Sequence, residues 1–232
     1  MVDGRDVDTQ TFPTFGQTFD AFLFDMDGTL INSIAATERV WGNWARKHGL
    51  DVEAFLPTMH GRRGIDTITA LNLPGVDPRA EALEVERGEI EDVEGVVAID
   101  GAIAFLAALP ADRWAIVTSA PIALARRRLE AAGIALPQTI VTAEDVKTGK
   151  PSPEGYLLAA SRLGVDPARC LVFEDVEAGV KAGERAGAGV VVVTATHAEE
   201  PVTGHPSIAS YRQLRLSVDA SGVLTLAPAV TS

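Results

Sequence analysis

The residues of this sequence that are able to do chemistry stand at the ends of short apolar runs or in the loops beyond them. Most of them are carboxylates, accompanied by one lysine and two hydroxyls. Carboxylates brought together repel one another unless a cation lies among them, and a donor set made only of oxygens suits a hard ion such as Mg²⁺. A lysine and a hydroxyl beside that ion would offer positive charge and donors to a phosphate dianion. These residues are Asp25, Asp27, Thr118, Ser119, Lys150, Glu174 and Asp175.

The chemistry would depend above all on the pair Asp25 and Asp27. A carboxylate can attack phosphorus and form an acyl phosphate that water later cleaves. Asp27, two residues beyond Asp25, is a candidate proton shuttle for such a reaction. The alternative is a solvated turn, because Asp-Met-Asp-Gly is also good turn material.

Apolar runs alternate with helical patterns along most of the chain, which predicts a doubly wound α/β fold with a parallel sheet. The carboxyl ends of parallel strands lie at one edge of the sheet, where open α/β folds bind ligands. We therefore expect the polar residues above to converge at that edge. The runs are Phe19–Phe24, Trp114–Val117, Thr139–Thr142, Cys170–Phe173 and Val190–Thr194, and the helical patterns are Ile122–Ala132, Pro153–Leu163 and Val176–Ala186.

The first crossover contains an insertion. From Ser33 to about Ala98 the chain shows helical stretches and no convincing strand, over a length that exceeds one crossover helix. We predict a helical cap over residues 33–97, between core segments 19–32 and 98–232, and a flexible polar leader over residues 1–18. A helix over Ile99–Leu109 would return the chain to the sheet. The helical stretches of the cap are Ala35–Lys47, Ile65–Leu71 and Arg79–Glu91, and Val223–Leu226 is a candidate short element near the end.

The composition excludes several functional classes. The 232 residues are 47% hydrophobic and 22% charged, which is typical of a globular protein. The net charge of −12 argues against binding to nucleic acid or to an anionic membrane, although a local cluster of positive charge can still bind an anionic substrate.

Further features of the chain bear on its location. No apolar run approaches the length of a membrane span, the first residues do not resemble a secretory signal, and Cys170 is the single cysteine. We expect a cytoplasmic monomer or small homo-oligomer that acts on a small phosphorylated metabolite.

Several segments, in this order, resemble the four sequence motifs of the haloacid dehalogenase superfamily. The resemblance spans Phe19 to about Thr194, and the insertion resembles the helical cap of the branch that includes β-phosphoglucomutase and phosphoglycolate phosphatase. Within that branch the chain is most similar to sugar-phosphate and glycerol-phosphate phosphatases. The segments are Asp25-Met26-Asp27-Gly28-Thr29-Leu30, then Thr118, then Lys150 in KTGKPSPEGY, then Glu174-Asp175 in FEDVEAG.

This resemblance implies a Mg²⁺-dependent phosphatase that hydrolyses a small sugar or polyol phosphomonoester through an aspartyl-phosphate. Asp25 would be the nucleophile, and Asp27 would protonate the leaving alkoxide and later deprotonate water. The residues implied to bind the phosphoryl group are Thr118, Ser119 and Lys150, and those implied to hold Mg²⁺ are Asp25, Asp27, Glu174 and Asp175.

The predicted cap supplies candidate substrate contacts at His60, Arg62 and Arg63. A basic cluster is usually a solvated face. Here, however, two adjacent arginines are flanked by glycines in an otherwise acidic chain, and guanidinium groups match oxyanions. Trp41 and Trp44, three residues apart on one helix face, are more typical of cap core than of a sugar-stacking surface.

Other interpretations remain open from the sequence. A phosphomutase of the β-phosphoglucomutase type would share all four motifs, and a binding protein could retain the fold without catalysis. A phosphorylated receiver domain also uses acidic strand ends and a lysine, but the long insertion argues against it. Taken singly, Asp175 could cap the following helix, and Thr118 or Ser119 could stabilise a turn.

Overall fold

A six-stranded parallel sheet forms the centre of the molecule. The structure is a computed structural model that describes residues 16–197 and 203–229. The strand order is β6-β5-β2-β7-β8-β9, and neighbouring strands are parallel, as expected for a doubly wound α/β fold. These strands are β2 (Ala21–Phe24), β5 (Trp114–Val117), β6 (Ile140–Val141), β7 (Cys170–Glu174), β8 (Gly189–Val193) and β9 (Ser207–Ile208).

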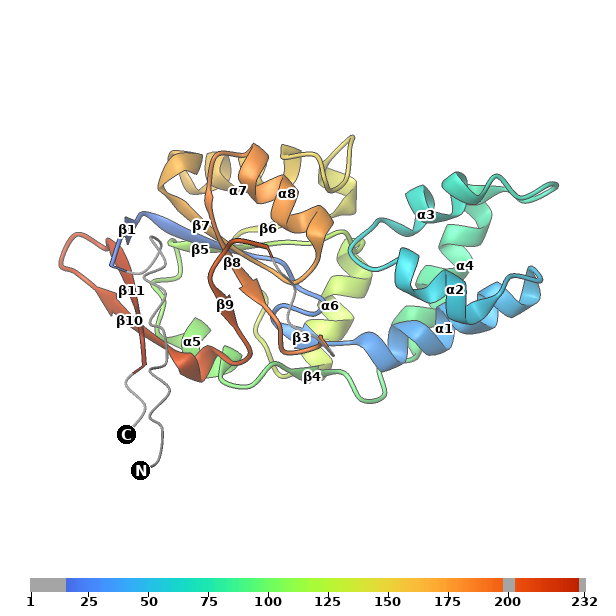
Figure 1. Cartoon of the computed structure of the whole chain (residues 1–232), viewed down its shortest axis with the longest axis horizontal. Coiled ribbons are helices and arrows are strands. Elements are labelled where there is room, and N and C mark those ends of the chain that lie inside the picture. Colours follow the sequence, from blue (N-terminus) through green and yellow to red (C-terminus); the bar gives the residue numbers. More distant parts are fainter. Residues whose placement is uncertain (1–15, 198–202, 230–232) are drawn as a thin grey trace, which may run out of the picture.

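Helices cover both faces of this sheet, which is why its central strands are apolar without alternation (Figure 1). Phe22 and Phe24 of β2 pack on the face covered by α5 and α6, in a cluster with Phe105. Leu23 packs on the other face, in a cluster with Tyr156 of α7. The helices are α5 (Ala102–Ala107), α6 (Ile122–Ala131), α7 (Glu154–Leu163) and α8 (Glu177–Arg185).

Four helices lie beside the sheet and surround a hydrophobic cluster of their own (Figure 1). We call these helices and the loops between them the helical lobe. Trp41 and Trp44 are both buried in its cluster, beside Phe55, as the spacing of the two tryptophans indicated. The helices are α1 (Ile34–Lys47), α2 (Val52–Phe55), α3 (Gly64–Leu71) and α4 (Pro78–Glu91), with a 3₁₀ helix η1 (Leu56–Thr58).

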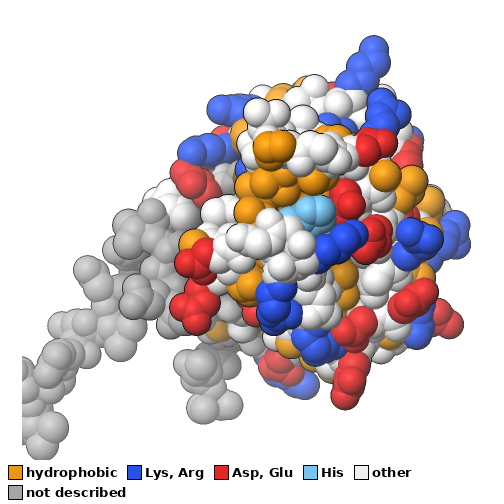
Figure 2. Space-filling view, turned by 90° about the vertical axis from the view of Figure 1, so that its right-hand side faces the viewer, with side chains coloured by type: hydrophobic (Ala, Val, Ile, Leu, Met, Phe, Trp, Pro, Cys, Tyr) orange, Lys and Arg blue, Asp and Glu red, His pale blue; other side chains and the backbone are white. Residues whose placement is uncertain are grey.

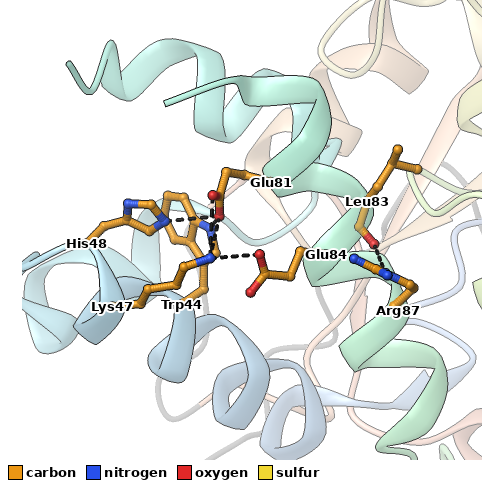
Figure 3. A network of polar contacts seen from close by, with 7 residues as sticks. All are labelled: Trp44, Lys47, His48, Glu81, Leu83, Glu84 and Arg87. Carbon is orange, nitrogen blue, oxygen red and sulfur yellow. Dashed lines mark hydrogen bonds and ion pairs between the residues drawn. The ribbon is translucent and has the colours of Figure 1, made fainter. Parts of the chain in front are cut away.

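A polar network ties α1 to α4 within the lobe (Figure 3). The carboxylate of Glu81 accepts a hydrogen bond of 2.8 Å from Trp44 Nε1 and lies 3.0 Å from Nε2 of His48. Lys47 reaches from α1 to Glu81 at 3.2 Å and to Glu84 at 2.7 Å. These contacts hold the outer part of the lobe together without involving the sheet.

A short antiparallel pair joins the lobe to the core. Strand β3 (Ile31–Asn32) pairs with β4 (Val97–Ala98), so the expectation of no strand before about Ala98 is wrong at its last residues. A two-residue strand carries no periodic signal that sequence analysis can detect. The helix expected over Ile99–Leu109 is shorter, because Gly101 precedes α5 in the left-handed region with φ of +79°.

The chain ends in elements that the sequence indicated only in part. Strands β1 (Thr18–Phe19), β10 (Leu214–Val218) and β11 (Leu224–Pro228) form a second, antiparallel sheet. The run Phe19–Phe24 is therefore not one strand. Between its two parts Asp20 turns away and pairs with Arg169 at 2.8 Å. Residues 1–15 of the predicted leader lie outside the described residues.

The remaining 3₁₀ helices are η2 (Ala143–Asp145), η3 (Pro167–Arg169) and η4 (Tyr211–Gln213). Within the described ranges, no helix has the length and apolar character that crossing a membrane requires. Figure 2 views the molecule from the side of the helical lobe, and basic and acidic side chains are interspersed over this face.

Replacing Phe105 by alanine should lower the free energy of unfolding by about 3–5 kcal/mol, the usual cost of removing a buried aromatic ring. Phe105 stacks on Phe22 with ring centroids 6.2 Å apart and packs against Tyr211 at 5.2 Å. Chemical denaturation measures the change. The control is Ile103→Ala in the same helix, where the side chain is 49% exposed and a loss below about 1 kcal/mol is expected. Equal losses in the two variants would contradict this account of the core.

Candidate active site

The carboxylates at the ends of β2 and β7 meet at the carboxyl edge of the sheet. The two strands are parallel and pair Phe24 with Phe173, so Asp25 follows one strand where Glu174 ends the other. The backbone N–H of Asp25 donates to the carbonyl of Phe173 at 2.9 Å. One carboxylate oxygen from each of Asp25, Glu174 and Asp175 lies within 4.8 Å of the others, and all three residues are buried.

Lys150 supplies positive charge to this cluster. It lies in the loop between β6 and α7, and its side chain is 6% exposed. Its Nζ donates to the Asp25 carboxylate and to the carbonyl of Val117 at 3.1 Å, and it lies 2.5 Å from Glu174. One ammonium thus contacts two of the three buried carboxylates and offsets part of their repulsion.

Groups that the sequence analysis did not single out hold Glu174 and Asp175 in place. The Tyr156 hydroxyl donates to Glu174 Oε1 at 2.6 Å, and Thr29 Oγ1 donates to Asp175 Oδ1 at 3.3 Å. Two glycines make the space: a Cβ on Gly179 would lie 1.8 Å from Glu174, and one on Gly28 would lie 1.9 Å from Asp175. Gly28 and Thr29 belong to the first motif and Tyr156 ends the segment KTGKPSPEGY, but the sequence analysis gave none of them a role.

Burial and crowding shift the pKa values of these groups. Burial raises the pKa of Asp25 to about 8, although the nearby Lys150 acts to lower it. Burial together with the charges of Asp25 and Glu174 raises the pKa of Asp175 well above its usual range. For Lys150, burial alone would lower the pKa, but the attraction of Asp25 and Glu174 outweighs it and the pKa is raised. The cluster therefore favours any further positive charge.

The donor set fits a metal cation. All ligand atoms are carboxylate oxygens, which suit a hard divalent ion. Asp175 does not cap the following helix: α8 begins at Glu177 after the N-cap Val176, which makes no side-chain capping hydrogen bond. The Asp175 carboxylate is thus directed to the cluster and not to the helix end.

A pocket of about 480 Å³ opens beside the cluster. Asp25, Asp27, Thr118 and Asp175 line it from the core. Asp27 is the most accessible of these carboxylates, with its side chain 30% exposed. The Thr118 Oγ1 accepts a hydrogen bond of 3.0 Å from the N–H of Ala120, so it stabilises the turn, as the alternative interpretation held, while also lining the pocket.

Contacts between the helical lobe and the core close the other side of this pocket. Ser119, predicted to bind phosphate, donates from Oγ to the carbonyl of Gly61 at 3.0 Å and also lines the pocket. His60 and Arg62 line the pocket from the lobe. Arg63 pairs with Asp66 at 2.6 Å and donates to the carbonyl of Val146 at 3.3 Å. Two of the three basic lobe candidates thus face the pocket, and the third bridges the lobe to the loop that carries Lys150.

Comparison with known proteins identifies the family of this chain. Residues 19–187 match the family of haloacid dehalogenase-like hydrolases, and the chain belongs to this family. Hexitol phosphatase A of Escherichia coli (strain K12) is 46% identical over 181 residues, covering 75% of this chain and 82% of that protein. Glycerol-1-phosphate phosphohydrolase 2 of Saccharomyces cerevisiae is 36% identical over 191 residues, covering 76% of this chain and 75% of that protein.

A solved structure shares the fold. The β-phosphoglucomutase from Clostridium difficile superposes with a TM-score of 0.71 at 22% identity, covering 85% of this chain and 93% of that chain. The resemblance drawn from the four motifs and the predicted fold class are both confirmed.

The pKa shifts predict how a divalent cation stabilises the protein. Because the pKa of Asp25 is raised from 3.8 to about 8 in the folded state, the cation-free folded protein binds more protons than the unfolded chain between these values. Its stability therefore falls as the pH rises through this window. A bound cation offsets this loss, so magnesium chloride should raise Tm more at about pH 8 than at about pH 5.5. Calorimetry at both pH values tests this, and Asp175→Asn should abolish the gain. An equal gain at both pH values would contradict the prediction.

The tight contact at Gly179 predicts a loss of cation affinity on substitution. A Cβ at this position must displace the Glu174 carboxylate, and disturbing such supporting contacts usually costs about 10–100-fold in metal affinity. Isothermal titration of Gly179→Ala with magnesium chloride measures the change. The control is Gly42→Ala in α1, where the nearest atom lies at 3.5 Å and affinity should be unchanged. Unchanged affinity in Gly179→Ala would show that Glu174 is not held as described.

Proposed function

We propose that this protein is a Mg²⁺-dependent phosphatase that hydrolyses a small sugar or polyol phosphomonoester through an aspartyl-phosphate on Asp25. The observation that carries the proposal is the meeting of Asp25 and Asp175, with Lys150 in contact with Asp25, beside a pocket that Asp25, Asp27, Thr118 and Asp175 line. Hexitol phosphatase A and glycerol-1-phosphate phosphohydrolase 2, both similar over about three quarters of this chain, support the choice of reaction and of substrate class.

Asp25 is the best candidate nucleophile. Its carboxylate lies at the base of the pocket with Lys150 in contact, and a positive neighbour favours the ionised form that attack requires. Mg²⁺ held by Asp25, Glu174 and Asp175, with the backbone carbonyl of Asp27, would neutralise phosphate charge and keep Asp25 ionised. Thr118 and Lys150 would donate to the phosphoryl oxygens, and Ser119 would support the loop from its bond to Gly61.

The reaction would proceed in two displacements. A carboxylate oxygen of Asp25 attacks phosphorus, a new P–O bond forms, and the bond from phosphorus to the ester oxygen breaks. The leaving alkoxide takes its proton from Asp27 and departs as an alcohol. A water molecule then attacks phosphorus while Asp27 removes one of its protons. The bond from phosphorus to Asp25 breaks, inorganic phosphate leaves, and the Asp25 carboxylate is restored.

The helical lobe would act as a cap that selects the leaving group. We propose that residues 33–97 form this cap over a core of residues 19–32 and 98–232. His60 and Arg62 would contact the substrate from the cap side of the pocket, whereas Arg63 would hold the cap to the core through Val146. A cap held in this way keeps bulk water from the reacting groups during transfer.

The cellular setting belongs to the same proposal. Cys170 is buried in β7, and burial raises the pKa of its thiol to about 12, which suits a structural and unreactive cysteine. We propose that the protein works in the cytoplasm as a monomer or small homo-oligomer on a small phosphorylated metabolite.

A mutase of the β-phosphoglucomutase type would use the same first displacement and return the phosphoryl group to a second hydroxyl. The fold alone does not separate the two reactions, and the names of the similar proteins favour hydrolysis. Incubation with glucose 1-phosphate distinguishes them, because a mutase would form glucose 6-phosphate without comparable release of free phosphate.

Replacing Asp25 by asparagine should lower the rate of phosphate release from sorbitol 6-phosphate or glycerol 1-phosphate by at least about 1,000-fold, because the nucleophile is lost. Rapid acid quench and mass spectrometry should detect one added phosphoryl group on the wild-type chain and none on Asp25→Asn. Asp112→Asn is the control. That side chain is 75% exposed, and its ion pair is with Arg113, which does not belong to the site. Substantial phosphate release by Asp25→Asn would refute the covalent mechanism.

A further inference from the structure

Arg128 of α6 contacts Asp27 and the helical lobe with a single guanidinium group. Its Nη1 donates to Asp27 Oδ1 at 2.9 Å. Its Nη2 donates to Glu89 Oε1 at 2.9 Å and to Thr37 Oγ1 at 2.7 Å. The side chain is 5% exposed and lines the pocket described above.

These contacts join side chains of the helical lobe to a helix of the core. Thr37 belongs to α1 and Glu89 to α4, both in the helical lobe, whereas α6 packs on the sheet. A guanidinium is planar and its donors point in fixed directions, so binding the lobe side chains also determines where Nη1 points. The position of the lobe and the position of the Asp27 carboxylate are therefore linked through one rigid group.

The buried charge of Arg128 is compensated by carboxylates on both sides. A buried guanidinium is costly unless it is paired, and here it faces two carboxylates, Asp27 and Glu89. Its Nε has no hydrogen-bond partner among the described residues. The hydrogen bonds that Arg128 makes thus all come from the two Nη atoms that reach Asp27 and the lobe.

The two donors to Asp27 bind the same oxygen. Ser33 Oγ donates to Oδ1 at 2.6 Å, and Arg128 Nη1 donates to that oxygen as well. No described residue donates to Oδ2, and Asp27 lines the pocket. Oδ1 is therefore held and Oδ2 is left available to exchange a proton with a group in the pocket.

We infer that Arg128 is a positioning residue, which orients Asp27 so that Oδ2 faces the leaving oxygen and ties that orientation to the lobe through Thr37 and Glu89. The inference rests on the proposed function, in which Asp27 protonates the leaving alkoxide. It assigns Arg128 no contact with the phosphoryl group. Replacing Arg128 should therefore impair proton transfer to the leaving group more than binding of the ester.

Two esters that differ in their need for a proton test the inference. A polyol alkoxide must be protonated as it leaves, whereas the phenolate of p-nitrophenyl phosphate leaves without a proton. Arg128→Met should lower kcat for sorbitol 6-phosphate by about 10–100-fold with little change in KM, because a positioned general acid contributes about 10²–10⁴-fold. The kcat/KM for p-nitrophenyl phosphate covers only the steps up to departure of the phenolate, and so excludes the later attack of water that Asp27 also assists. It should fall by less than about threefold. Arg128→Lys, which keeps a positive charge, should recover part of the loss on sorbitol 6-phosphate.

The matched control is Arg126→Met, on the same helix, where the side chain is exposed and makes no hydrogen bond or ion pair with any residue that the structure describes. It should behave as wild type on both esters. An equal loss of kcat/KM on the two esters in whichever Arg128 variant folds would overturn the inference, because it would indicate a structural role alone. Wild-type turnover of the esters measures the proposed function separately, and a wild-type protein that cleaves neither would overturn both.

Discussion

The close approach of three buried carboxylates at one sheet edge is the constraint on which the rest of the structure depends. Asp25, Glu174 and Asp175 meet because β2 and β7 are adjacent and parallel and end at the same level. Burial in this crowded place raises the pKa of Asp25 and of Asp175, so the ionised carboxylates are stabilised when positive charge lies close by. Lys150 supplies part of it, and the oxygen donors are arranged to accept more.

The packing around this edge follows from that constraint. Glycines at positions 28 and 179 leave room for the carboxylates of Asp175 and Glu174, and the Tyr156 hydroxyl binds Glu174 from the buried face of α7. These residues lie on helices and turns that pack against the hydrophobic core. A site built on such elements keeps its geometry without relying on mobile loops.

Asp27 differs from the other carboxylates because it faces the pocket and is bound by groups outside the cluster. Ser33 and Arg128 hold one of its oxygens, and Arg128 also binds Thr37 and Glu89 of the helical lobe. Asp25, the proposed nucleophile, is thus held at the edge of the sheet, whereas the orientation of Asp27, the proposed acid, depends on how the lobe and the core meet.

The sequence by itself determined the fold class and the chemical groups of the site, because apolar strands, helical periods and motif residues such as Asp25 and Lys150 are local signals. It did not determine which side chains from distant segments share a contact. The tertiary structure decided that Arg63 bridges the lobe to Val146, that Ser119 binds Gly61, and that Arg128 reaches Asp27. It also decided that β1 joins β11, since two-residue strands have no period of their own. Contacts of this kind depend on the docking of elements far apart in the chain, for which no local pattern exists.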